Sequence, residues 1–152
     1  MDLLEQTKKL CKLYNIIPAR SKGQNFLIKE EAYDEIAAAA DLQPDDVVLE
    51  AGPGLGFLTA KLAVLAGRVI AVELDDKLAG VLKTGLLAKG VKNVEVVNED
   101  VLKIPLTPFI KGGDQRYLPD KEGGGYKIVA NLPYNITSIF LRKFLSEEEN
   151  KP

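Results

Sequence analysis

The chain has 152 residues, the length of a single domain that can bury its own core. Hydrophobic residues make up 46% and charged residues 28%, a globular composition that excludes collagen-like, low-complexity and wholly disordered chains. Histidine is absent and cysteine occurs once, so a Ser-His-Asp triad, a Cys-His pair, a histidine-ligated metal and an intrachain disulfide are impossible. Lone Cys11 fits a reducing cytoplasm, and no run approaches the ~18 apolar residues of a membrane span.

Charge is unevenly distributed along the chain. The formal net charge of -2 argues against a uniformly basic nucleic-acid binder. Residues 1–29 nevertheless carry six basic side chains against Asp2 and Glu5, which makes this stretch +4 and leaves -6 for the remainder. Such a basic arm indicates contact with a polyanion, although a solvated helix face at an ordinary terminus explains the charge as well.

Helices and strands are expected to alternate. Apolar residues near helical spacing predict the helices, and short apolar runs that end at turn residues predict buried parallel strands. The expected elements are helices over 3–14, 29–40, 55–66 and 76–89, strands over 47–51, 68–74, 94–97 and 127–130, and a Gly-rich loop over 111–125. Strands separated by helices of this length imply right-handed crossovers, so the expected fold is α/β, an open and mainly parallel sheet with flanking helices.

Polar or glycine-rich residues follow each expected strand. In chain order the clusters are Gly52–Gly56, Glu73 with Asp75, Asp100, and Asn131–Tyr134. In open parallel sheets, ligands bind beyond the carboxyl ends of the strands. A purely structural turn needs no acid after the second and third strands and no amide after the fourth, so the joint placement predicts a ligand site.

The glycine-rich turn at 52–56 lets the backbone approach a ligand closely, although a turn required only for packing would look the same. Phe57 stands where a dinucleotide fingerprint needs glycine, which disfavours phosphate cradling. Glu73 lies about 20 residues after the first glycine, where a carboxylate can accept both hydroxyls of a ribose. Asp100 could accept from an adenine amino group, whereas Asp75 and Asp76 suit capping of the following helix.

Asn131-Leu132-Pro133-Tyr134 is the most specific element of the chain, because an amide, a proline and an aromatic residue directly follow a buried strand. Asparagine supplies an oxygen acceptor, the residue before proline is held extended, and tyrosine offers a face for stacking a planar base. A turn with a core tyrosine is the alternative. The segment Gly23–Leu27 fits either a ligand cover or a loop staple.

Five motifs together resemble the S-adenosylmethionine-dependent ribosomal RNA adenine N6,N6-dimethyltransferase family, with its KsgA-like housekeeping branch and Erm-like resistance branch. These are GQNFL at 23–27, LEAGPGLGFLT at 49–59, VELD at 72–75, ED at 99–100 and NLPY at 131–134. The resemblance implies a Rossmann-like class I methyltransferase, with Glu50 near the methionine end of the cofactor. The cofactor contacts that it implies are Asn25, Leu27, Gly52, Gly54, Glu73, Asp100 and Asn131.

The resemblance also implies the reaction: two successive methylations of the exocyclic amine on adjacent adenosines of small-subunit ribosomal RNA, during ribosome biogenesis. Asn131 and the backbone carbonyl of Pro133 would orient the amine protons, and Tyr134 would stack the target base. No histidine base is needed because the proton departs after methyl transfer. The arm would contact phosphates of the immature small subunit through Lys8, Lys9, Lys12, Arg20 and Lys22.

The expected organisation is a basic arm and cofactor-covering segment over 1–28, followed by an incomplete methyltransferase domain over 29–152. Family members continue with further strands and a small helical domain, so this chain resembles an amino-terminal fragment. For such a fragment we expect weakened cofactor binding and poor or absent RNA methylation. Its fourth strand would be an exposed apolar edge, which predicts low stability, self-association or a partner chain. The loop over 111–125 is longer than the family usually shows.

Three alternatives stay open. An Erm-like enzyme for large-subunit RNA is the nearest, although Lys22-Gly23 and Asn135-Ile136-Thr137 favour the housekeeping branch. A ribosome-assembly module that holds the cofactor without turnover is the second. A nicotinamide dehydrogenase is the third, and Phe57 disfavours it. Neither a metal nor a membrane is an expected partner, and the expected location is the cytoplasm.

Overall fold

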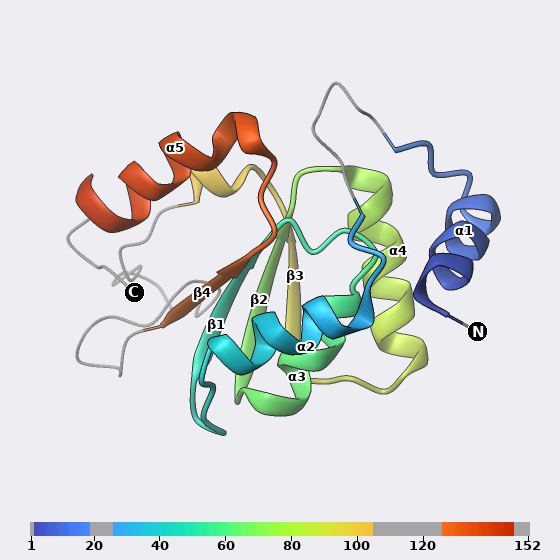
Figure 1. Ribbon diagram of the computed structural model, residues 1–152, viewed down its shortest axis with the longest axis horizontal. Helices are drawn as coiled ribbons and strands as arrows, with labels where there is room; N and C mark the ends of the chain where they lie inside the picture. Colours follow the sequence, from blue (N-terminus) through green and yellow to red (C-terminus); the bar gives the residue numbers. More distant parts are fainter. Residues whose placement is uncertain (1, 19–25, 105–125, 148–152) are drawn as a thin grey trace, which may run out of the picture.

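A four-stranded parallel sheet lies between two sets of helices in the computed structural model, which describes residues 2–18, 26–104 and 126–147 (Figure 1). The strands pair in the order β3-β2-β1-β4, and every pairing is parallel. They are β1 (Val47–Ala51), β2 (Arg68–Glu73), β3 (Val94–Asn98) and β4 (Lys127–Ala130). The expected open α/β sheet is confirmed.

Five α-helices accompany the strands in the described part of the chain. They are α1 (Leu3–Leu13), α2 (Glu30–Ala39), α3 (Phe57–Leu65), α4 (Asp76–Ala88) and α5 (Tyr134–Arg142). A 3-10 turn, η2 (Val101–Lys103), follows β3, and a π-helical turn, η3 (Lys143–Glu147), follows α5. The helices α3 and α4 are the crossovers that make β1, β2 and β3 parallel.

The helix α3 begins two residues later than the sequence predicts. Gly56 precedes it with a φ of 83°, in the left-handed region that favours glycine. A β carbon at Gly56 would also collide with the Leu82 side chain of α4. This glycine therefore serves two purposes, because it turns the backbone into α3 and lets α4 pack against the turn.

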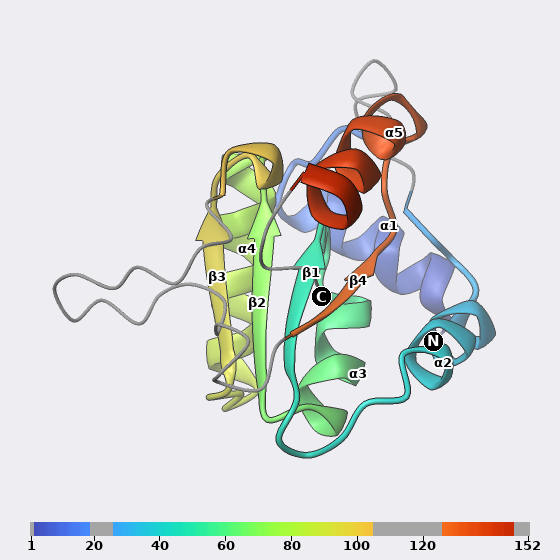
Figure 2. The same cartoon turned by 90° about the vertical axis from the view of Figure 1, so that its left-hand side faces the viewer.

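Successive residues of a strand point to opposite faces of the sheet, so each strand contributes to two cores. Different helices cover these two faces. Figures 1 and 2 show α5 on one side of the sheet and α1 and α4 on the other. On the α5 side, Leu49 and Ile70 belong to one core cluster with Phe140 and Phe144. On the other side the core gathers side chains from α1, α2 and α3 around two strand valines: Leu3, Tyr33, Val48, Leu58, Leu62 and Val69.

Local hydrogen bonds fix how the helices begin. The Asp75 side chain accepts from the backbone N–H groups of Lys77 and Leu78, at 3.0 and 3.1 Å. The predicted capping of α4 is therefore confirmed at Asp75, whereas Asp76 is the first residue of the helix. Lys77 in turn donates to the carbonyl of Asn15, 2.8 Å away, and so ties α4 to the residues that follow α1.

Among the helices of the described segments, none has both the length and the hydropathy of a transmembrane span.

Candidate functional site

A cleft of about 200 Å³ opens at the carboxyl ends of β1, β2 and β4, where the sequence places its polar clusters. Seven of the predicted site residues line it, from positions at or just after the ends of β1, β2 and β4 and from the segment before α2. They are Leu27, Gly52, Gly54, Glu73, Asn131, Pro133 and Tyr134. Asp100 lines an adjoining cavity of about 110 Å³, together with Gly52, Glu73 and Pro133. The predicted convergence at this edge of the sheet is therefore present in the structure.

Glycine is required where the turn after β1 meets its neighbours. Gly52 and Gly54 have φ values of 69° and 58°, which L side chains rarely adopt. A β carbon at Gly54 would lie 3.3 Å from the Phe26 ring, tighter than an ordinary contact. The backbone of the turn can therefore approach both the cover residue Phe26 and anything held in the cleft.

Glu73 joins two loops at the mouth of the cleft. Its Oε2 accepts from the Gly54 N–H at 3.0 Å and its Oε1 from the Asp75 N–H at 3.0 Å. The side chain is buried, and burial raises its pKa, while the two backbone hydrogen bonds oppose that shift. Each carboxylate oxygen keeps a second lone pair for a ligand hydroxyl.

Glu50 places a carboxyl group in the buried part of the site, which lowers the stability of the fold. Its carboxyl is 1% exposed and lines the cleft, yet neither oxygen has a hydrogen-bond partner among the described residues. Burial, opposed by the nearby Thr59 hydroxyl and reinforced by the charge of Glu73, raises the pKa of Glu50 to about 8. An unpartnered buried carboxylate destabilises a fold, so its position at a ligand cleft indicates that a ligand group completes it.

The segment after β4 presents an aromatic side chain at the rim. Tyr134 is 94% exposed and is the first residue of α5. Pro133 precedes it as the helix cap, and its carbonyl accepts from the Ile136 N–H at 3.2 Å and the Thr137 hydroxyl at 3.1 Å. A substrate that uses this carbonyl would share it with the first turn of α5.

A family model described as ribosomal RNA adenine dimethylase matches residues 19–151. The chain belongs to this family. Ribosomal RNA small subunit methyltransferase A of Alkaliphilus metalliredigens is 42% identical over 144 residues, which cover 94% of the chain and 47% of that relative. The protein of the same name from Dehalococcoides mccartyi strain CBDB1 is 45% identical over 151 residues, covering 99% and 47%. The chain thus spans about half the length of the curated relatives it matches.

Two solved structures share the fold. A dimethyladenosine transferase from Plasmodium falciparum superposes with a TM-score of 0.66 at 31% identity, covering 84% of this chain and 40% of that one. The 23S rRNA methyltransferase ErmE gives the same TM-score at 37% identity, covering 80% and 43%. The predicted family and the predicted Rossmann-like fold are confirmed.

Not every predicted site residue of this dimethylase-family chain lines the cleft. Asn25, Arg20 and Lys22 lie outside the described residues. Lys8, Lys9 and Lys12 are exposed on α1, which contributes no residue to the cleft or to the cavity beside it. Within the described residues there is no cluster of three His, Cys, Asp or Glu side chains that could hold a metal ion.

Two lining aromatic residues were not singled out from the sequence. Phe26 belongs to the quoted GQNFL motif, which is the signal that could have found it. Tyr33 lies on α2, is 7% exposed and donates from its hydroxyl to the Leu27 carbonyl at 3.1 Å. Burial and then the charge of Glu50 raise the pKa of Tyr33 to about 12. A tyrosine on an alanine-rich helix is typical of a core, so its sequence context carries no such signal.

Proposed function

We propose that this chain is the cofactor-binding and catalytic part of an S-adenosylmethionine-dependent methyltransferase that dimethylates two adjacent adenosines of small-subunit ribosomal RNA. One observation carries the proposal: the orphaned carboxyl of Glu50 and the loop-joining carboxyl of Glu73 line the same cleft as Asn131 and Tyr134. The small-subunit RNA substrate rests on the names of the relatives.

The residues present fit the cofactor. The buried Glu50 carboxylate lacks a cationic partner, and the ammonium group of the methionine end would supply one. Glu73 would accept the ribose hydroxyls with its remaining lone pairs, and Asp100 the adenine amino group. The backbone of Gly52 and Gly54 would pass close to the methionine end. Leu27 and Asn25 of the covering segment would also contact the cofactor. When bound, this cofactor supplies an electrophilic methyl group on sulfur.

The base side of the cleft would orient the nucleophile. An adenine amine is a poor nucleophile because its lone pair is delocalised into the ring. The side-chain oxygen of Asn131, with the Pro133 carbonyl, would accept the amine protons and hold the lone pair toward the methyl group. Tyr134 would stack on the flipped base, and its exposed ring is available for that contact. The proton then leaves to water after transfer, so the chain needs no histidine.

A calorimetric titration tests the cofactor assignment. The chain should bind S-adenosylmethionine and S-adenosylhomocysteine but not NAD, and Glu73→Ala and Asp100→Ala should each remove binding. Glu35→Ala is the matched control, because Glu35 is an exposed carboxylate of α2 that lines neither cavity. NAD binding, or adenosyl binding that survives both substitutions, would overturn the assignment.

Methylation assays then separate the remaining functions. An active enzyme should methylate adenosines of immature small subunits, and Asn131→Ala should abolish the activity while cofactor-independent binding to the particle persists. An assembly module would bind and never methylate. The similarity to ErmE favours one further comparison, with large-subunit RNA as the substrate. Preferential labelling of that RNA would assign the chain to the resistance branch.

The partners beyond RNA are also part of the proposal. We place the protein in the cytoplasm with its ribosomal substrate, and we propose that two copies associate through β4. In the described part of the chain β4 pairs only with β1, and the groove beside it is lined by the apolar side chains of Tyr126, Ile128 and Leu145. Sedimentation velocity should show a mass that rises with concentration, and Ile128→Lys should remove that rise.

A further inference from the structure

A second hollow lies on the other side of the glycine-rich turn. It encloses about 310 Å³ between α1, α3 and α4, and we call it the α1–α4 groove. Leu55, Phe57 and Leu82 supply apolar lining, and Tyr14 adds an aromatic ring. Its volume is at the small end of the ~300–1,000 Å³ that is typical of ligand clefts. Its lining overlaps that of the cofactor cleft only at Leu55 and Phe57.

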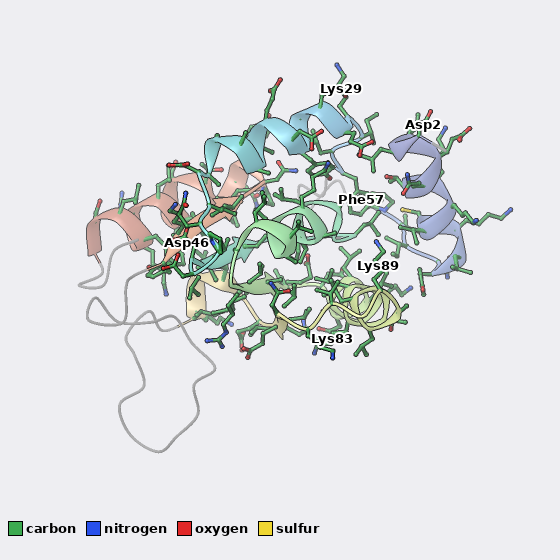
Figure 3. The ribbon with its side chains drawn as sticks, turned by 90° about the horizontal axis from the view of Figure 1, so that it is seen from below. Asp2, Lys29, Asp46, Phe57, Lys83 and Lys89 are labelled. Carbon is green, nitrogen blue, oxygen red and sulfur yellow. The ribbon has the colours of Figure 1, made fainter. Side chains whose placement is uncertain are left out.

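Two lysines from helices far apart in the sequence line this groove. Lys9 is on α1 and Lys89 directly follows α4, and both are exposed. Neither forms an ion pair with any described residue, and no carboxylate belongs to the lining of the groove. In Figure 3, Lys89 lies on the side of α4 toward α1, whereas Lys83 lies on the opposite side. The groove thus presents two unpaired positive charges around an apolar lining.

The charge of the surrounding elements has the same sign. Residues 2–18 and 76–92 hold seven lysines against the three carboxylates Asp2, Glu5 and Asp76, a net charge of +4. The other described residues hold seven cationic against fourteen acidic side chains, a net charge of -7. Positive charge is therefore concentrated on the two helices that border the groove, in a chain whose net charge is negative. A surface of this kind attracts polyanions and steers their approach.

We infer that the α1–α4 groove is a second RNA-binding surface, in which Lys9 and Lys89 contact phosphates while an unpaired base lies against Tyr14 and the apolar lining. The inference rests on the proposed function, because that function supplies RNA as the partner. Cations with an aromatic stacking surface are the combination that binds single-stranded nucleic acid. An acidic protein segment would satisfy the lysines but would leave the aromatic and apolar lining without a planar partner.

The test compares two double variants with the same change in charge. Lys9→Gln/Lys89→Gln removes the two groove charges, and Lys83→Gln/Lys92→Gln removes two exposed lysines that do not line the groove. The probe is a fluorescein-labelled stem–loop RNA, with its anisotropy measured between about 50 and 200 mM salt. The groove variant should bind about tenfold more weakly than the control variant at the lowest salt. The slope of log affinity against log salt should become shallower by about 1.5 in the groove variant, because two phosphate contacts are lost.

A charge-neutral variant and a competitor decide between the occupants. Tyr14→Ala should weaken RNA binding several-fold with an unchanged salt slope, which a purely electrostatic surface would not show. Equal losses in the two lysine variants would overturn the inference. So would displacement of the RNA by polyglutamate as effectively as by unlabelled RNA. If the wild-type chain binds no RNA at all, the proposed function itself fails, whereas RNA binding that ignores the groove refutes only this inference.

Discussion

The two faces of the sheet carry opposite kinds of side chain at neighbouring positions. On the α5 face, Leu49 and Ile70 are at most 1% exposed and belong to an apolar core cluster. On the other face, the adjacent strand position Glu50 is just as buried but has no partner for its carboxyl. At these neighbouring positions the α5 face therefore adds stability, whereas Glu50 on the other face lowers it beside the cleft.

The largest effect is expected on the apolar face. Leu49→Ala should lower the free energy of unfolding by about 3 kcal/mol, because it leaves a cavity in a cluster of buried side chains. Urea denaturation followed by circular dichroism measures the change. Val64→Ala, at an 83% exposed position of α3, should change stability by less than about 0.5 kcal/mol. Equal losses in the two variants would contradict the assignment of Leu49 to the core.

The opposite sign is expected at Glu50. The pKa of this carboxyl is about 8 in the folded protein, against its ordinary 4.5, so the folded state holds a proton that the unfolded chain releases. The stability that this proton confers is complete below pH 4.5 and is lost as pH rises toward 8. Glu50→Gln should therefore raise the unfolding free energy at pH 7 by about 3 kcal/mol and flatten its dependence on pH.

Urea denaturation of wild type and Glu50→Gln across this pH range checks both expectations. The Gln variant keeps the size of the side chain, which makes it the matched substitution. A wild-type stability that rises with pH between 4.5 and 8, in parallel with the variant, would show that Glu50 is already ionised in the empty cleft.

Cofactor binding should offset the unfavourable burial of the Glu50 carboxylate. If the ammonium group of S-adenosylmethionine pairs with Glu50, the carboxyl must lose its proton on binding. Below pH 8, the affinity should therefore increase about tenfold for each unit by which the pH is raised. Calorimetric titration in buffers of different ionisation enthalpy would detect the released proton. Glu50→Gln should bind more weakly and without that pH dependence. Proton uptake on binding, or no change in bound protons, would contradict the pairing of Glu50 with the ammonium group of the ligand.

The smallest effect concerns the loop at the mouth of the cleft. Asp75→Ala removes the side chain that caps α4 and should cost about 1 kcal/mol of unfolding free energy. Asp75→Asn should restore most of it, since asparagine caps helices nearly as well. Thermal denaturation of both variants checks the pair. If the Asn variant is as unstable as the Ala variant, the loss comes from charge and not from the cap.

Much of this arrangement could be read from local sequence. The apolar runs of β1 and β2 and the acid that ends β2 predict buried parallel strands with a ligand site beyond them. The start of α3 is less local, because it depends on the left-handed conformation of Gly56 and on the contact with Leu82 of α4. Sequence spacing does not report a contact between residues 26 positions apart, so the helix was predicted to begin too early.

The electrostatic character of the site could not be read in that way. Whether the Glu50 carboxyl has a partner depends on which groups α2 and α3 bring beside it, and the residue type alone does not decide this. The engagement of the Pro133 carbonyl by Thr137 depends likewise on α5 beginning at Tyr134. The proximity of Lys9 and Lys89 joins two helices 80 positions apart. These features arise from packing in three dimensions, which a pattern along the chain does not encode.

The double hydrogen bond of Glu73 has a consequence for how the empty protein moves. One carboxylate holds the Gly54 and Asp75 amides, so the glycine-rich turn and the loop before α4 are fastened to a single buried point. Their amide protons are then shielded from exchange with solvent until that carboxylate lets go. The exchange rates of these two amide protons therefore report together on whether Glu73 still joins the two loops.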